Sequence, residues 1–196
     1  MGGELTAADV ARGRLVTSVD YPGVYVHMRE AAMTDASPTT IRELGVDDVG
    51  LLQGMNSLFG NVFGDAEAYL EAPPSEAWLE RLLATRSFVA LVAEEASGSI
   101  VGGVTAYELV KFERERSEVY IYDLAVAESH RRRGIATRLI AALQEIAGHR
   151  GAYVVFVQAD QTDDAAIALY SGLGRREDVL HFDIPVPVGP KRTERR

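Results

Sequence analysis

The sequence contains no cysteine among its 196 residues. This absence excludes disulfide bonds, thiolate metal sites and a cysteine nucleophile, so covalent catalysis would need another nucleophile. It also fits a reducing compartment. Because the first residues lack the apolar stretch of a secretory signal, we expect a cytoplasmic location.

Long apolar runs and excess basic charge are lacking too. No apolar stretch is long enough to span a bilayer, so no membrane partner is expected. Lys and Arg number 20 against 29 Asp and Glu, a formal net charge of -9, and so acidic a chain is a poor partner for nucleic acid. The acidity suits a cationic substrate, or it serves solubility alone. The four histidines, His27, His130, His149 and His181, do not have metal-ligand spacing, so no metal site is predicted.

The sequence does contain alternating strand and helix patterns between two irregular ends. Its length is typical of one domain. We assign residues 1–38 to an N-terminal extension, in which Tyr21–Val26 could add one strand. Residues 39–187 form the main domain, and residues 188–196 form a basic tail.

Apolar periodicity predicts the elements of the main domain. Strands are expected at 39–44, 87–95, 99–110, 118–126, 152–159 and 177–187, and helices from residue 46, after Ser75, over 134–147 and over 163–173. Gly60 and Gly64 are expected to end helices, and Gly102 and Gly103 to allow close backbone packing within a strand. This order indicates an α/β (α+β) fold with helices on both faces of a sheet.

The stretch after the strand at 118–126 has the pattern of a phosphate-binding loop. Three arginines, Arg131 to Arg133, are followed by Gly134 and at once by an apolar helix. The first turn of a helix leaves backbone N–H groups unpaired and its dipole favours anions, while Gly134 lets a ligand approach closely. A solvated basic patch is the alternative, but the position between a buried strand and a buried helix favours anion binding.

These residues resemble the GNAT superfamily of acyl-CoA N-acyltransferases. Arg131-x-x-Gly134-x-Ala136 is similar to the family motif [Q/R]-x-x-G-x-[G/A], and Leu124-Ala125-Val126 to the L-x-V before it. Ala166, Leu169-Tyr170 and Leu173-Gly174 resemble a later A-x-x-L-Y-x-x-x-G signature. The resemblance covers residues 39–187. It implies a mixed central sheet that is splayed at an acetyl-CoA site.

A narrower resemblance is to the aminoglycoside 3-N-acetyltransferases of the GNAT type. The stretches that carry it are LFGNVFGD, KFERERSE, YIYDLAV, RRGIAT, VQAD and HFDI. It implies transfer of an acetyl group from acetyl-CoA to the 3-amine of an aminoglycoside, by direct attack in a ternary complex. GNAT enzymes are often dimers, so a homodimer is an expectation that the sequence leaves open. One departure is Asp163, where the family often has Asn at the start of a helix; this puts a contact to pantetheine in doubt.

The resemblance also implies roles for residues at the cofactor. We expect a bulge that turns the N–H of Leu124 to the thioester carbonyl and the N–H of Val126 to the pantetheine, which lies beside 124–126 in place of a strand. The other residues expected at the cofactor are Ala125, Arg131, Arg132, Arg133, Gly134, Ile135, Ala136, Thr137 and Tyr170.

The attacking amine must lose a proton, and Asp123 is the expected base because it interrupts an apolar strand beside the bulge. A structural pairing of Asp123 is the alternative. Tyr170 is expected to protonate the departing thiolate, or else it is a core residue. Tyr120 and Tyr122 should face one side of their strand and line the acceptor pocket, unless they belong to the core.

Acidic side chains are expected to bind the ammonium groups of the acceptor. The candidates besides Asp123 are Glu113, Glu118, Asp160, Asp163, Asp164 and Asp183, for each of which helix capping or solvated surface charge is the alternative. Two rival functions stay open at this stage. One is a GNAT enzyme for a polyamine or a protein lysine, and the other is a non-catalytic acyl-CoA-binding module.

Overall fold

The computed structural model describes residues 39–187 of the chain. The extra strand considered at Tyr21–Val26 and the basic tail at 188–196 lie outside this range. The strands are β1 (Thr40–Glu43), β2 (Phe88–Glu94), β3 (Ile100–Val110), β4 (Ser117–Val126) and β5 (Ala152–Val157). The helices are α2 (Val49–Phe63), α3 (Ala66–Tyr69), α4 (Glu76–Leu83), α5 (Ile135–His149) and α6 (Asp164–Ser171), with a short 3-10 turn at Glu128–His130.

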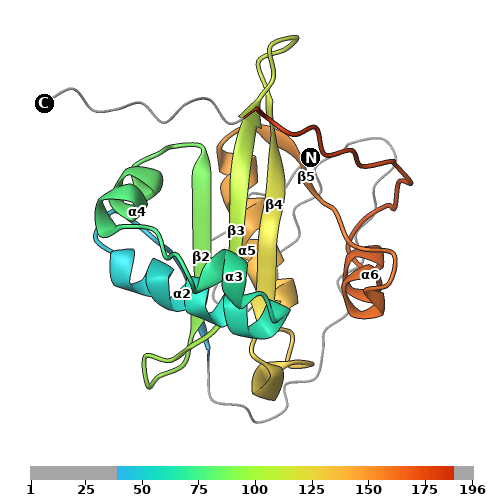
Figure 1. Ribbon diagram of the computed structural model, residues 1–196. Helices are drawn as coiled ribbons and strands as arrows, with labels where there is room; N and C mark the ends of the chain where they lie inside the picture. The colour runs from blue at the N-terminus through green and yellow to red at the C-terminus, as the bar shows by residue number, and fades with distance from the viewer. Residues whose placement is uncertain (1–38, 188–196) are drawn as a thin grey trace, which may run out of the picture. The chain divides into compact units, whose positions relative to one another are not determined.

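The five strands form one mixed sheet in the order β1-β2-β3-β4-β5. Neighbours are antiparallel from β1 to β4, and β5 is parallel to β4. Helices α2 to α4 cover one face of the sheet and α5 covers the other (Figure 1). The predicted α/β architecture with helices on both faces is therefore confirmed.

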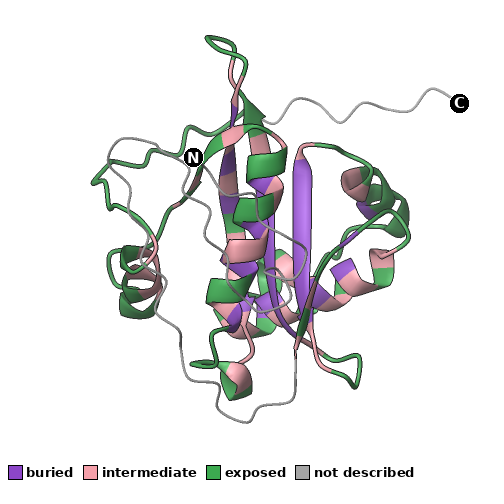
Figure 2. Ribbon diagram, turned by 180° about the vertical axis from the view of Figure 1, so that it is seen from behind, coloured by how far each residue is buried: buried purple, intermediate pink, exposed green. Residues whose placement is uncertain are grey.

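The central strand β2 shows why the sheet needs both layers. Phe88, Ala90 and Val92 belong to the core on the α2 side, whereas Val89, Leu91 and Ala93 belong to the core on the α5 side. Alternate residues of a strand point to opposite faces, so a continuously apolar strand must be covered twice. Figure 2 shows this strand buried along almost its whole length, in contrast to the pink and green α6.

Two glycines of β3 bring a helix close to the sheet on each side. A Cβ on Gly102 would lie 3.1 Å from Ile135 of α5, and one on Gly103 would collide with the side chain of Met55 on α2. Only hydrogen fits at such approaches. The predicted role of Gly102 and Gly103 in close packing is confirmed.

Two expectations from the sequence are wrong. Gly60 does not end a helix: it is buried within α2, and the helix ends at Gly64, whose φ is 68°. No strand forms at 177–187, where apolar side chains such as Phe182 and Ile184 are 76% and 86% exposed. Within the described residues this segment pairs with no strand. Pro185 and Pro187 also lack the N–H groups that a strand ladder uses.

Helix α3 was not predicted. It is a single turn whose start is capped by Asp65, which accepts a hydrogen bond from Ala68 N at 3.0 Å. The predicted cap of the next helix is confirmed, because Ser75 accepts from Trp78 N at 3.3 Å. No helix in the described part of the chain is both long and apolar enough to cross a membrane.

Candidate active site

The sheet opens between β4 and β5. The two strands pair from Ser117 with Ala152 to Ile121 with Val157, and β5 ends there. Beyond this point the second half of β4, Tyr122–Val126, pairs with β3 only. One edge of this half-strand therefore has no strand neighbour among the described residues, which is the splayed geometry that the GNAT resemblance implied.

The register fixes which backbone groups face the open edge. Ala127 N donates to Val101 O of β3 at 2.9 Å. In an antiparallel pair every second residue bonds to the same neighbour, so the N–H groups of Val126 and Leu124 point away from β3. Both N–H groups thus face the side from which β5 has departed. This arrangement leaves two N–H donors along the open edge, those of Leu124 and Val126, with one residue between them.

A bulge in β4 decides where the side chains point. Thr105 pairs with Asp123 but Ala106 pairs with Ile121, so Tyr122 is an extra residue. Before the bulge Ile121 packs in the core on the α5 side, and after it Ala125 packs on the α2 side. An inserted residue shifts the alternation by one position. As a result, the consecutive residues Tyr122 and Asp123 both face the α2 side and line one cavity.

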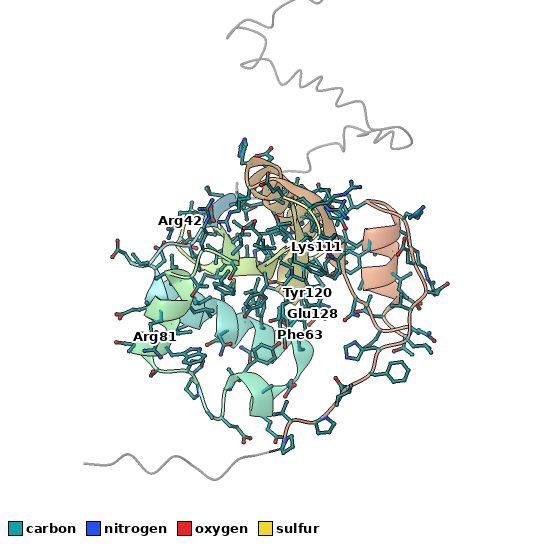
Figure 3. All side chains as sticks on the ribbon, turned by 90° about the horizontal axis from the view of Figure 1, so that it is seen from above. Arg42, Phe63, Arg81, Lys111, Tyr120 and Glu128 are labelled. Atoms are coloured by element: carbon teal, nitrogen blue, oxygen red, sulfur yellow. The ribbon has the colours of Figure 1, made fainter. Side chains whose placement is uncertain are left out.

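This cavity has a volume of about 440 Å³ and lies between the sheet and helices α2 to α4. Its lining residues are mostly apolar or aromatic: Leu52, Gln53, Met55, Asn56, Ser57, Phe59, Tyr69, Leu70, Pro73, Pro74, Trp78, Leu79, Leu82, Phe88, Thr105, Tyr107, Tyr122 and Asp123. Asp123 is the one carboxylate among them, and no Lys or Arg lines the cavity. Figure 3 labels Phe63 of α2 and Tyr120 of β4, neither of which lines the cavity.

Asp123 is held by two hydroxyl groups. Tyr69 Oη donates to Asp123 Oδ1 at 2.8 Å, and Thr105 Oγ1 donates to Oδ2 at 3.3 Å. Burial raises the pKa of Asp123, while both hydrogen bonds oppose the rise because they favour the charged form. A carboxylate with a raised pKa in a mainly apolar cavity is a stronger base than a solvated one, which suits proton removal from an ammonium group.

An aromatic row runs across the sheet beside Asp123. Tyr122 makes edge contacts with Tyr107 on one side and Tyr120 on the other, with ring centroids 5.8 and 6.0 Å apart. Tyr120 in turn stacks on Phe156 of β5 at 5.0 Å. Tyr122, which is 62% exposed, lines the cavity. Tyr120 is not among the lining residues, and its hydroxyl donates to Gln158 Oε1 at 3.1 Å.

The loop before α5 lies at the other end of the open edge and has the geometry expected of an anion site. Gly134, the N-cap of α5, has a φ of 74°, and its side-chain position is open space. Arg132 also has a positive φ, 65°, which is uncommon for a residue with a Cβ. Within the described residues no side chain caps this helix start, and Arg131, Arg132 and Arg133 are exposed and form no ion pair.

The first turn of α5 therefore has free donors. The first bond of the helix is from Arg138 N to Gly134 O, so the N–H groups of Ile135, Ala136 and Thr137 lie ahead of the helical ladder. Arg131 Nε donates to Val126 O at 3.3 Å and so ties the loop to the open half of β4. Unpaired N–H groups, a positive helix end and three guanidinium groups are the features that suit a pyrophosphate.

Tyr170 lies on α6 and does not line the cavity of Asp123. It is half-buried and packs against the core on the α5 side. Burial and the Asp163 carboxylate raise the pKa of its hydroxyl, so the group stays protonated at neutral pH. Asp163 itself accepts a hydrogen bond from Ala166 N at 2.9 Å, the helix cap that the sequence offered as its alternative role.

The other acidic candidates lie outside the cavity. Glu113 and Glu118 sit at the end of the β3–β4 hairpin, where both pair with Lys111, at 3.9 and 3.2 Å. Asp183 pairs with His181 at 3.1 Å, and Asp160 and Asp164 are exposed. Binding of an acceptor by these residues stays a prediction. No group of three metal-ligating side chains occurs within residues 39–187.

Of the residues that line the cavity, the sequence indicated only Tyr122 and Asp123 as site residues; those that it did not indicate include Tyr69, Thr105 and Tyr107. Tyr69 is on the unpredicted helix α3, and only the tertiary structure brings it to Asp123. Thr105 and Tyr107 are two residues apart on β3, so their common face was readable from the alternation of the strand. Which face of β3 would meet a cavity was not visible in the sequence.

The chain belongs to the acetyltransferase (GNAT) family, whose model matches residues 53–174. The match includes the open half of β4, the loop before α5 and α6. The protein is thus an N-acetyltransferase, and the expectation of a GNAT fold is confirmed.

Solved structures of aminoglycoside acetyltransferases are similar to this chain. One, from an uncultured soil metagenomic sample, is 55% identical, with a TM-score of 0.75 over 76% of this chain and 99% of the other. A second soil metagenomic enzyme, in complex with sisomicin, is 34% identical, with a TM-score of 0.70 over 76% and 97% of the two chains. Among curated proteins, an uncharacterized N-acetyltransferase, YhfO of Bacillus subtilis, is 30% identical over 58% of this chain and 76% of its own length.

Acetyl-CoA is the cofactor of this family. The described residues fit it. The open half of β4 offers two backbone donors to an extended chain such as pantetheine, and the start of α5 offers unpaired N–H groups and guanidinium groups to a pyrophosphate. The open space at Gly134 lets a phosphate approach the backbone.

Proposed function

We propose that this enzyme transfers an acetyl group from acetyl-CoA to the 3-amino group of an aminoglycoside, and that it thereby confers antibiotic resistance. The main observation in favour of this proposal is that Asp123 is the one carboxylate in an aromatic-lined cavity beside the open half of β4. The similarity to aminoglycoside acetyltransferases, at 55% and 34% identity, supports the substrate class.

The loop residues hold the cofactor in this proposal. Backbone N–H groups at the start of α5 bind the pyrophosphate together with the arginines; the residues are Arg131, Arg132, Arg133, Gly134, Ile135, Ala136 and Thr137. Val126 N–H holds the pantetheine, which lies along the strand beside Ala125, and Leu124 N–H polarises the thioester carbonyl. Bound acetyl-CoA supplies the activated acetyl group.

Asp123 takes a proton from the acceptor ammonium, which makes the amine a nucleophile. The aromatic walls of the cavity, including Tyr122 and Tyr107, pack on the sugar rings and attract their ammonium groups. Tyr170, which stays protonated at neutral pH, donates its proton to the departing thiolate. Because the chain has no cysteine, no thiol of the protein carries the acetyl group, and attack in a ternary complex is the proposed order.

Thiol release from acetyl-CoA tests the proposal with gentamicin, sisomicin, spermidine and a lysine peptide as acceptors. We expect release with the two aminoglycosides, lines that intersect in double-reciprocal plots of initial rates, and acetylation at nitrogen 3 in the NMR spectrum of the product. Activity on spermidine or the peptide alone would replace the aminoglycoside assignment. Modification of a different amine would correct only the position.

We also propose a homodimer and a cytoplasmic location. Strand β5 has a free edge and exposed apolar residues, including Tyr153 at 47%, and the segment 177–187 exposes further apolar side chains. Exposed apolar surface of this kind often marks an interface. Light scattering should give about twice the chain mass at micromolar concentration, and cell fractionation should place the enzyme with cytoplasmic markers; a monomer or a different fraction would refute the respective point.

A further inference from the structure

We propose that Tyr69 is a positioning residue, whose hydroxyl holds the carboxylate of Asp123 in the orientation and charge state that a base requires. This inference rests on the proposed role of Asp123. Tyr69 lies on α3 and Asp123 on β4, 54 positions later in the chain, yet their side chains meet at 2.8 Å. Tyr69 acts through Asp123 rather than on the reacting atoms.

The packing of α3 on α2 explains how Tyr69 reaches the sheet. A Cβ on Gly60 would lie 2.9 Å from Leu70 and 3.0 Å from Tyr69, so this glycine lets α3 approach closely. Asn56 Nδ2 donates to Tyr69 O at 2.6 Å and fixes the backbone. The ring of Tyr69 also contacts Phe59 and Phe63, with centroids 6.3 and 5.7 Å away. These contacts fix the ring, so that the hydroxyl needs no adjustment to meet the carboxylate.

The chemistry of the contact suits a base. The two hydrogen-bond partners that Asp123 has among the described residues, Tyr69 and Thr105, are neutral hydroxyls, one on each oxygen. An arginine there would stabilise the carboxylate so strongly that it would accept a proton poorly. A hydroxyl stabilises the charge more weakly and leaves lone pairs for the substrate. Burial and the Asp123 carboxylate raise the pKa of Tyr69, so Tyr69 remains a donor.

Tyr69→Phe removes the hydroxyl and retains the ring contacts. The hydrogen bond lowers the pKa of Asp123, so its loss raises that pKa, and the fall of kcat/KM on the acid side moves to higher pH. At pH 7 we expect kcat to fall about tenfold or more, as for loss of a hydrogen bond to a charged group. The KM for acetyl-CoA should not change. Thr85→Val is the control, because it removes a hydroxyl that donates to Arg81 O outside the cavity.

A double-mutant cycle separates positioning from a general structural effect. If Tyr69 acts only through the carboxylate, Tyr69→Phe causes no further loss in an Asp123→Asn background. Gly60→Ala is a second variant. It displaces α3 and should also move the fall of kcat/KM on the acid side to higher pH. It replaces Tyr69→Phe in the test if thermal unfolding shows that Tyr69→Phe does not fold.

The outcomes distinguish failure of the base role of Asp123 from failure of the positioning role of Tyr69. Full turnover by Asp123→Asn would remove the base role and with it this inference. A large loss in Asp123→Asn, combined with an unchanged pH profile in folded Tyr69→Phe, would overturn the positioning role alone. An equal further loss in the Asp123→Asn background would also overturn it, since Tyr69 would then act independently of the carboxylate.

Discussion

The first half of β4, Ser117–Ile121, lies between β3 and β5, whereas the second half, Tyr122–Val126, has β3 alone as its strand neighbour. In the first half, Val119 and Ile121 are 1% and 3% exposed and serve the core. In the second half, backbone donors face an open edge and Asp123 faces a cavity. One strand thus stabilises the fold where it is paired twice and provides the site where it is paired once.

Substitution at Asp123 should have the largest effect on the second half of β4. Asp123→Asn retains the shape and most hydrogen bonding but cannot take up the proton, so we expect kcat to fall by about 10²- to 10⁴-fold. Calorimetry should give an unchanged Kd for coenzyme A, because the loop before α5 is intact. Turnover equal to that of the parent would show that Asp123 is not the base.

Substitution of Ile121, two positions before Asp123, should have the opposite effect: it should lower stability and leave substrate binding unchanged. Ile121→Ala removes a buried side chain from the doubly paired half, so the free energy of unfolding should fall by about 2–5 kcal/mol. The KM values at a temperature where the variant is folded should match those of the parent. Urea unfolding measures the first effect. A loss of activity in the folded variant without a loss of stability would contradict the division of β4 into two halves.

Gly134 tests the anion site at the end of the open edge. Its φ of 74° strains a β-branched residue by about 1–2 kcal/mol, so Gly134→Val should distort the loop and raise the Kd for coenzyme A about tenfold. Titration calorimetry measures this change. Gly98, which also has a positive φ and open space at its Cβ position but lies in the β2–β3 turn, offers Gly98→Val as a matched control with unchanged affinity.

The smallest predicted effect is that of the Asp123 charge on the stability of the folded protein. Burial raises the pKa of Asp123 above its unfolded value, so the folded state binds the proton more tightly. This contribution to stability is present below the unfolded pKa and is lost as the pH rises through the folded pKa. At pH 7 the charge therefore destabilises the fold, and Asp123→Asn should raise the Tm slightly. The gain should vanish in acid; a lower Tm at pH 7 would contradict it.

The sequence predicted most elements of the fold because their patterns are local. The apolar run of β2 and the apolar stripe of α5 need no knowledge of distant residues. The failures were non-local. The segment 177–187 has apolar residues typical of a strand, but a strand forms only where the backbone pairs with a neighbour, and a local pattern does not specify that pairing. Gly60 resembles a helix stop, yet in the fold it provides space for α3.

The site divides in the same way. The loop from Arg131 to Gly134 was predictable, since an anion site at a helix start is formed by neighbouring residues whose spacing is visible in the sequence. Asp123 was noticed as a charge in an apolar strand. Its partners Tyr69 and Thr105 were not, because hydrogen bonds across 54 and 18 positions depend on how α3 and β3 pack.

The amino-acid sequence by itself determined most of the order of strands and helices, the arginine-glycine loop before α5 and the presence of one unusual carboxylate, because each depends on residues adjacent in the chain. Only the tertiary structure decided that β5 ends at Val157 and opens the sheet. It also decided that the extra residue Tyr122 places its own side chain and that of Asp123 on one face. Register and packing result from contacts between distant segments, and a local pattern does not specify those contacts.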